Sequence, residues 1–366
     1  MRRIAIVLVF AHLLLTGHAL SAEELKERAS VKGHPLVTDR VALSPDGKML
    51  ATGGKTGREV QVIVWKVASG KEIATFPYPS HSVESVAFSP DGRLLAAAGG
   101  NLVVAWDVAS RKQVFTHKGN SVSIPALAFD PDGKKLGAYG GGQARLWDVT
   151  SGKELSSFEG PVGYGVVAFS GDLRTLACPN IQEIDLWDVN AGKMRETLPE
   201  RPGQVACVSF SPDGKTLASA TAPYGRGKVR TGDLRVWDVA TGRERAGFRG
   251  VIGPHVSVVE TVRLSPDGRT VAMLHNTLFY GELALTLLDI RSGWWSVRHP
   301  PGYSFTSIAF TSDDRLFATG TPDDKAVKLW EVSLPGSGAV SPEPHSSGQR
   351  SEIRDHEGLF RPRRHQ

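Results

Sequence analysis

Short apolar runs alternate with turn-forming residues along most of the chain. Residues 83–118 are representative. Four runs follow one another: an apolar run with Val83, Val86 and Phe88, a small-residue run at 94–98, an apolar run at 102–108 and a polar run at 113–116. The turn-forming residues Ser-Pro-Asp-Gly, Gly-Gly-Asn and Ser-Arg-Lys separate them in that order. Runs of this length, bounded by Gly, Pro, Asp and Ser, are typical of β-strands. The pattern predicts four short strands in this unit.

The same unit recurs through the chain. Ser-Pro-Asp-Gly begins at Ser44, Ser89, Ser211 and Ser265, and variants of it begin at Asp130, Ser170 and Thr311. Proline presets the backbone for a tight turn, and glycine accepts the left-handed conformation that follows, so the motif predicts a hairpin between the first two strands. The aligned aspartates of the seven copies are Asp46, Asp91, Asp132, Asp172, Asp213, Asp267 and Asp313.

A bulky residue follows each of these turns in the third apolar run. It is tryptophan in six units and leucine in the sixth: Trp65, Trp106, Trp147, Trp187, Trp237, Leu288 and Trp330. A second turn, usually Ser-Gly-Lys or a variant of it, comes next in all units but the last. Seven four-stranded units predict an all-β fold, a seven-bladed β-propeller in which each blade buries its faces against its neighbours.

Tryptophan is followed by aspartate in four units, at Trp106-Asp107, Trp147-Asp148, Trp187-Asp188 and Trp237-Asp238, and variants stand at Trp65-Lys66, Leu288-Asp289 and Trp330-Glu331. With these dipeptides the sequence resembles the WD-repeat β-propeller family from about residue 25 to residue 334. The family's Gly-His dipeptide is clear only at Gly33-His34, and most units lack the usual aspartate of the second hairpin. The resemblance therefore implies the fold, with most of the family's buried hydrogen-bond network missing.

The seventh unit has three strand signals and no fourth, whereas spare strand-like residues lie at 28–32, before the first turn. We therefore predict that the N-terminal segment supplies the outer strand of the last blade. The expected organisation is a signal peptide at 1–22, a propeller at 23–334 and a disordered tail at 335–366, which is rich in Pro, Gly and Ser and ends in basic residues.

The first residues resemble a secretory signal: Arg2 and Arg3 precede an apolar run at 4–15, and small residues follow at 17–22. The run is shorter than a membrane span requires. These features predict a periplasmic or secreted protein with no membrane span after signal removal, and an uncleaved anchor is the alternative. In an oxidising compartment Cys178 and Cys207 could pair, although both stand in apolar runs where a free thiol also fits.

The formal charge of +5 is mostly outside the propeller. Without Arg2, Arg3 and the tail, which contributes +1, the body carries only +2. This weak charge argues against nucleic acid as a partner.

Two of the second hairpins are extended, at residues 220–232 and 275–282 in the fifth and sixth units. The first carries Tyr224, Arg226, Lys228 and Arg230, and the second carries Phe279 and Tyr280. Long loops on rigid scaffolds often carry function, and Tyr and Arg are enriched at binding hot spots. These six residues are the candidate partner-binding residues, and tolerated surface insertions are the alternative.

No catalytic motif stands out. The histidines fall in different units without metal-ligand spacing, and turn formation explains the repeated aspartates. We therefore expect a monomeric ring without catalytic residues, metal or cofactor that binds a protein partner. The alternative is an exported enzyme of propeller type, such as a hydrolase or lactonase with a channel site.

Overall fold

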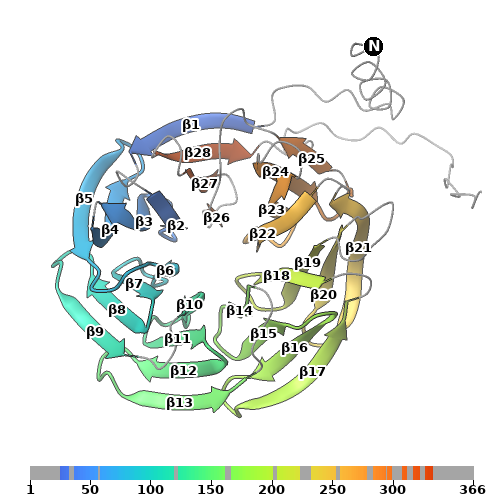
Figure 1. The fold of residues 1–366 in the computed structure, drawn as a ribbon, viewed down its shortest axis with the longest axis horizontal. Helices are drawn as coiled ribbons and strands as arrows, with labels where there is room; N and C mark the ends of the chain where they lie inside the picture. Colours follow the sequence, from blue (N-terminus) through green and yellow to red (C-terminus); the bar gives the residue numbers. More distant parts are fainter. Residues whose placement is uncertain are drawn as a thin grey trace, which may run out of the picture. The chain divides into compact units, whose positions relative to one another are not determined.

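The computed structural model describes residues 25–32, 37–56, 58–118, 123–160, 166–200, 204–222, 232–252, 256–277, 283–293, 295–298, 307–310, 316–321 and 326–332. Every strand in this part of the chain belongs to one of seven four-stranded antiparallel sheets, arranged as the blades of a β-propeller (Figure 1). No helix of these residues is long and apolar enough to cross a membrane. The predicted fold class is confirmed, whereas the predicted signal peptide (1–22) and tail (335–366) lie outside the described residues.

The first four blades follow one another along the chain, each running from its inner to its outer strand. Blade 1 contains β2 (Val37–Leu43), β3 (Met49–Thr56), β4 (Glu59–Lys66) and β5 (Lys71–Pro77). Blade 2 contains β6 (Ser85–Phe88), β7 (Leu94–Gly99), β8 (Leu102–Asp107) and β9 (Gln113–Lys118). Blade 3 contains β10 (Ala126–Phe129), β11 (Lys135–Gly140), β12 (Gln143–Asp148) and β13 (Glu154–Glu159). Blade 4 contains β14 (Ala168–Phe169), β15 (Thr175–Pro179), β16 (Glu183–Asp188) and β17 (Lys193–Pro199).

The remaining blades keep the same order of strands. Blade 5 contains β18 (Gln204–Phe210), β19 (Thr216–Ala222), β20 (Gly232–Asp238) and β21 (Arg243–Ile252). Blade 6 contains β22 (Val256–Leu264), β23 (Thr270–Thr277), β24 (Leu283–Asp289) and β25 (Trp295–Arg298). Blade 7 contains β26 (Ser307–Phe310), β27 (Leu316–Thr321) and β28 (Ala326–Val332), and its fourth strand is β1 (Leu25–Lys32).

The N-terminal strand closes the ring, as predicted. β1 pairs antiparallel with β28, from Leu25 opposite Val332 to Lys32 opposite Ala326. Its Val31 is buried in a cluster that joins blade 7 to blade 1, together with Val41 and Leu329. Because the first and last strands share one sheet, the ring has no open seam between blade 7 and blade 1.

The turns between the first two strands have the expected geometry. Gly47 adopts a φ of 67°, in the left-handed region, and its N–H donates to Ser44 O at 2.8 Å. The degraded copy in blade 4 has Leu173 at the same place, and Leu173 also takes a left-handed φ of 55°. The turn thus persists where glycine is replaced, because Leu173 is buried between blades 3 and 4.

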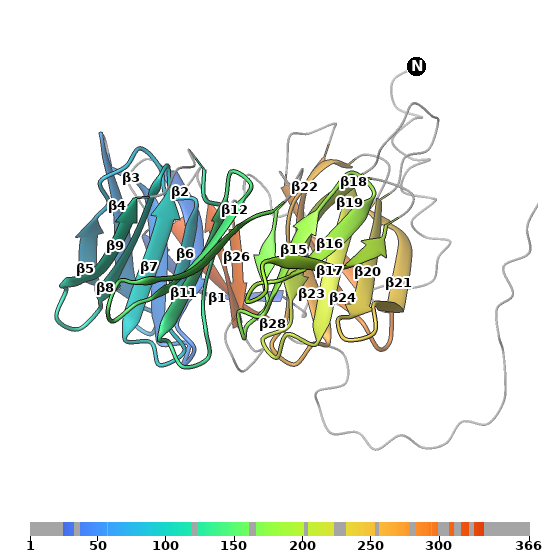
Figure 2. The same ribbon diagram turned by 90° about the horizontal axis from the view of Figure 1, so that it is seen from below.

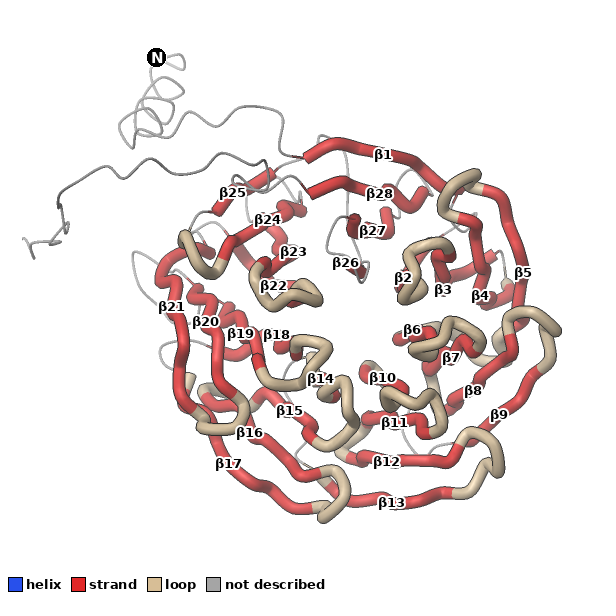
Figure 3. Tube along the Cα trace, turned by 180° about the vertical axis from the view of Figure 1, so that it is seen from behind, coloured by secondary structure: helices blue, strands red, loops and turns tan. Residues whose placement is uncertain are grey.

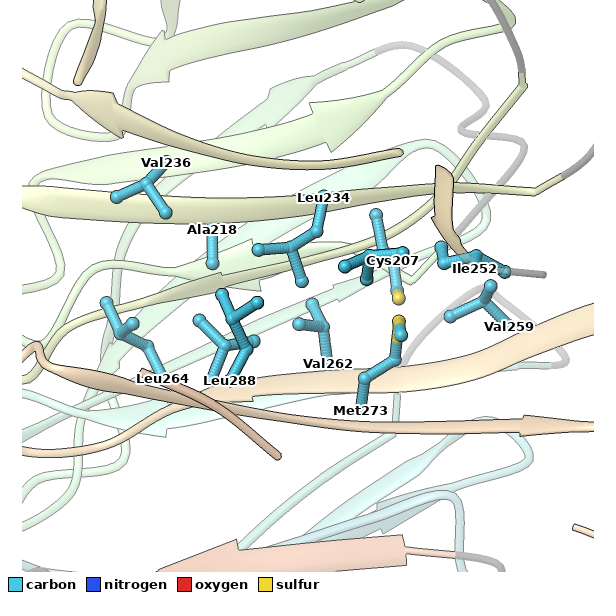
Figure 4. Close-up of a cluster of buried hydrophobic side chains, with 13 residues drawn as sticks. Cys207, Ala218, Leu234, Val236, Ile252, Val259, Val262, Leu264, Met273 and Leu288 are labelled. Atoms are coloured by element: carbon cyan, nitrogen blue, oxygen red, sulfur yellow. The ribbon is translucent and has the colours of Figure 1, made fainter. Parts of the chain in front are cut away.

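The apolar core is divided among the contacts between blades. Each cluster of buried apolar side chains in the described residues joins two successive blades. Figure 4 shows the cluster between blades 5 and 6, where Leu234 and Val236 face Val262 and Leu288. Leu288 occupies the place of tryptophan in this unit, which explains how the sixth repeat keeps its packing without the aromatic ring.

Candidate interaction face

The antiparallel order of the strands sorts the connections onto two faces of the ring. Turns between the first and second and between the third and fourth strands share one end of the blades. The hairpins between the second and third strands share the other end with the loops that join successive blades; we call this end the hairpin face. Figures 2 and 3 show the blades from the side and from behind.

The six predicted partner-binding residues lie outside the described residues, but their flanking strands are described. Tyr224, Arg226, Lys228 and Arg230 fall between β19 and β20, and Phe279 and Tyr280 fall between β23 and β24. These strand pairs belong to adjacent blades, 5 and 6, so the strand ends that flank the six residues lie on the hairpin face of neighbouring blades. The strands run further than the predicted hairpin limits, to Ala222 and Thr277. His275 is therefore a strand residue, buried and 2.9 Å from Thr286 Oγ1 through its Nε2.

The base of the blade 5 hairpin is fixed by hydrogen bonds from Thr221 and Asp233. The Asp233 N–H donates to Thr221 Oγ1 at 2.9 Å, and the Gly250 N–H donates to Asp233 Oδ1 at 3.0 Å. Gly232, at the start of β20, lies so close to the Thr221 carbonyl that a Cβ there would clash with it. This hairpin base is consequently held from both strands and from the outer strand β21.

A buried carboxylate supports the same region from the preceding loop. Glu200, directly after β17, is fully buried; Ser219 Oγ donates to its Oε1, and Trp237 Nε1 donates to Ser219 Oγ at 2.9 Å. Arg235 Nε lies 3.4 Å from Glu200 Oε2, and Arg235 Nη1 lies 3.5 Å from Glu244 Oε2. Burial raises the pKa of Glu200 to about 7, although the Ser219 hydrogen bond and the Arg235 charge oppose that shift. This cluster joins a loop and three strands beneath the blade 5 hairpin.

The link from tryptophan to a hydroxyl recurs in only some blades. Trp65 Nε1 donates to Thr52 Oγ1 at 2.9 Å in blade 1, and Trp330 Nε1 donates to Thr319 Oγ1 at 2.8 Å in blade 7. In blades 3 and 4 the equivalent residues are Ala138 and Cys178, and the indole N–H groups of Trp147 and Trp187 are buried without an acceptor. The tryptophan–hydroxyl hydrogen bond is thus absent from blades 3 and 4 and present in blades 1, 5 and 7.

Glu84 connects the loops of blades 1, 2 and 3 on the hairpin face. Its Oε2 accepts from Ser123 Oγ and from the Ile124 N–H, both at 2.7 Å, and its carbonyl accepts from Arg40 Nε at 2.8 Å. Sequence reasoning overlooked Glu84 and Glu200 because neither belongs to the repeated motif. An alignment of the units would have revealed Thr52, Ser219 and Thr319 at one repeated position.

The two cysteines do not form a disulfide. Cys178 in β15 and Cys207 in β18 are both free and buried, in different blades. Burial raises the pKa of each thiol to about 12. Both residues act as small apolar core residues, and the disulfide alternative is wrong.

Turn formation accounts for five of the seven aligned aspartates, as the sequence indicated. Asp46 Oδ1 accepts from Ser44 Oγ at 2.7 Å and from the Lys48 N–H at 3.1 Å, and these hydrogen bonds lower the pKa of Asp46. The same Ser–Asp hydrogen bond forms at Asp91, Asp172, Asp213 and Asp267. Within the described part of the chain, no three His, Cys, Asp or Glu side chains group as a metal site would require.

Four segments match the family described as WD domain, G-beta repeat: residues 70–107, 111–148, 192–238 and 295–331. A WD repeat-containing protein of Synechocystis sp. is 35% identical over 102 residues, which cover 28% of this chain and 26% of that protein. Nuclear distribution protein PAC1 of Arthroderma otae is 31% identical over 157 residues, covering 41% of this chain and 32% of the relative. WD repeat-containing protein SL1-17 of Schistosoma mansoni is 29% identical over 152 residues, which cover 41% of this chain and 44% of the relative. The chain spans less than half the length of each of these relatives.

Each matched segment covers the outer strand of one blade and three strands of the next. The segment at 70–107, for example, contains β5 of blade 1 and β6, β7 and β8 of blade 2. This stagger between repeat and blade is the reason that β1 has to complete blade 7. With seven such blades and four matched repeats, the chain belongs to the WD-repeat β-propeller family.

Proposed function

We propose that this chain is an exported, non-catalytic scaffold that binds a protein partner through the hairpins of blades 5 and 6. WD-repeat propellers generally mediate protein interactions, and the rigid ring offers loops on a fixed frame. Export is supported by the basic start, the apolar run at 4–15 and the small residues that follow it.

The observation that carries this proposal is the anchoring of the blade 5 hairpin. Hydrogen bonds from Asp233 and Gly250, with the Glu200 cluster below, hold both strands at the point where residues 223–231 begin and end. A fixed base lowers the conformational entropy that a loop loses on binding. The hairpin sequence offers Tyr224, Arg226 and Arg230, residue types that suit an acidic or aromatic patch on a partner.

The test is cross-linking in the native host followed by mass spectrometry, with the exported fraction collected separately. A variant with Tyr224→Ala, Arg226→Ala and Arg230→Ala should lose most of the partner that the wild type captures from that fraction, while its thermal unfolding midpoint stays unchanged. The matched control replaces three exposed residues of the opposite face, Lys48, Arg93 and Lys215, with alanine and should keep the partner. Undiminished capture by the first variant would reject this hairpin as the binding surface, and a stoichiometric metal in the purified protein would contradict a non-catalytic role.

A further inference from the structure

The base of the blade 5 hairpin lies directly above two residues that contact one buried carboxyl group. Ser219 and Arg235 are opposite each other on β19 and β20, and both contact Glu200. Two residues nearer the hairpin on the same strands, the Asp233 N–H donates to Thr221 Oγ1 at 2.9 Å. Because side chains two positions apart on a strand point to the same face, both residue pairs lie on one face of the sheet. Separation of β19 and β20 past the hairpin base therefore parts the two residues that contact Glu200.

Glu200 makes these contacts with an incomplete set of hydrogen bonds. The residue is 0% exposed, its N–H donates to Gln182 O at 2.9 Å, and Ser219 Oγ donates to its Oε1. Its other oxygen, Oε2, is also buried and accepts no hydrogen bond from the described residues. Arg235 Nε, 3.4 Å away, supplies an opposite charge. An ionised carboxylate buried with one oxygen unsatisfied is costly, whereas a proton on Oε2 removes the charge.

The charged groups around Glu200 are mainly acidic. Arg235 is shared, because its Nη1 lies 3.5 Å from Glu244 Oε2 on β21 and its Nη2 lies 4.0 Å from Asp233 Oδ2 on β20. On β16, Glu183 is opposite the residue before Glu200, so strand alternation places it on the other face of blade 4. One guanidinium thus faces three carboxyl groups. Burial, with the like charge of Glu244 adding to it, raises the pKa of Glu200 to about 7, although Ser219 and Arg235 oppose this shift.

The protonation of Glu200 is linked to opening of the hairpin base. Opening lets water reach the carboxyl group, whose pKa then returns to its ordinary value of 4.5. The preference for the closed base is complete below pH 4.5 and is lost as the pH rises through 7. We propose that Glu200 makes the base of the blade 5 hairpin pH-dependent, closed over a protonated carboxyl group and loosened when that group ionises. Its effect on partner binding, which rests on the proposed function, is tighter capture at acidic pH.

Hydrogen exchange of the full chain, without any partner, tests the hairpin base. The amides to follow are those of Asp233 and Gly250, which donate hydrogen bonds there at 2.9 and 3.0 Å. Their protection, corrected for the intrinsic exchange rate, should fall at least about tenfold between about pH 5 and about pH 8 in the wild type. The Gly160 N–H, which donates to Gly142 O at 2.8 Å in blade 3, should keep its protection.

Two variants assign the response to one carboxyl group. Glu200→Gln keeps an oxygen for Ser219 but cannot ionise, so its protection at the hairpin base should be equal at the two pH values. Glu244→Gln changes an exposed carboxylate beside the same arginine and should keep the fall. Should Glu200→Gln fail to fold, Ser219→Ala replaces it: this variant lacks a hydrogen bond that favours the ionised form, so the fall should move to higher pH. Unchanged protection in the wild type, or the wild-type fall in Glu200→Gln, would overturn the proposal.

Capture of the partner identified by cross-linking separates this proposal from the proposed function. The wild type should capture several-fold less partner at the higher pH than at the lower, and Glu200→Gln should capture the same amount at both. If exchange at the hairpin base responds to pH as expected while capture does not, this hairpin is not the binding surface. The proposed function is then wrong, and the pH-dependent hairpin base is confirmed.

Discussion

At the scale of single residues, the tryptophan that six of the seven repeats carry has two roles. Its ring fills the contact between blades, as Trp147 does against Phe115 with ring centroids 5.6 Å apart. Its indole N–H needs an acceptor once it is buried, because an unsatisfied buried donor costs about 1–3 kcal/mol. Thr52, Ser219 and Thr319 supply that acceptor in their blades, whereas Ala138 leaves Trp147 without one.

Replacing Ala138 with serine should therefore stabilise the ring. The new hydroxyl would stand where Ser219 stands in blade 5, within reach of Trp147 Nε1, and we expect the free energy of unfolding to rise by about 1 kcal/mol. Chemical denaturation measures this change. As a control, Ala218→Ser puts a hydroxyl among apolar side chains between blades 5 and 6 and should destabilise the protein. An Ala138→Ser variant no more stable than the wild type would show that the indole gains nothing from the hydroxyl.

At the scale of elements, the structure adds to the sequence mainly where strands meet loops. The strands of each blade were predictable because their turns are encoded locally, by residues such as Pro45 and Gly47. The closing strand was predictable from the missing fourth strand of the last unit. The clusters around Glu84 and Glu200 were not, because they depend on which residues the fold brings together from the loops between blades.

Among these clusters, the one around Glu200 makes stability depend on pH. Its pKa is raised from an ordinary 4.5 to about 7 in the folded protein, so folding favours the protonated carboxyl. Protonated Glu200 thereby contributes on the order of 3 kcal/mol to the free energy of unfolding below pH 4.5. This contribution is lost as the pH rises through 7. The aspartates whose pKa is lowered, such as Asp46 and Asp91, act in the opposite direction and at lower pH, below their ordinary value of 3.8.

A Glu200→Gln variant should consequently show a flatter profile of unfolding free energy between pH 4.5 and pH 7 than the wild type. The slope is the quantity to compare, because the substitution also removes the charge that faces Arg235. Glu59→Gln changes an exposed carboxylate of β4 and should keep the wild-type slope. Equal slopes in Glu200→Gln and the wild type would place the pH dependence elsewhere.

The molecule as a whole depends on the sheet that β1 and β28 share. Each of the other blades is made of strands that follow one another along the chain, but blade 7 combines the two ends of the propeller. Without β1, strand β28 would expose an unpaired edge, and the cluster between blades 7 and 1 would lose Val31.

Deletion of residues 23–36 should accordingly lower the thermal unfolding midpoint sharply, by on the order of 10 °C. Val31→Ala is the finer test: the lost methyl groups should cost about 2 kcal/mol of stability. Ser30→Ala, at the neighbouring exposed position, should leave stability unchanged. An unaltered melting curve after the deletion would show that β1 does not hold the ring closed.

Closure by β1 also sets an order of events during synthesis. Six blades can form as soon as their own consecutive strands have left the ribosome, whereas β1 is made first and its partner β28 is made after all the others. The entropic cost of joining distant segments grows with the length of chain between them, and such long-range pairing is slow. Strand β1 therefore stays without its partner strand until nearly the whole propeller has been synthesised. The pairing of β28 with β1 is the step that closes an open arc of blades into a ring.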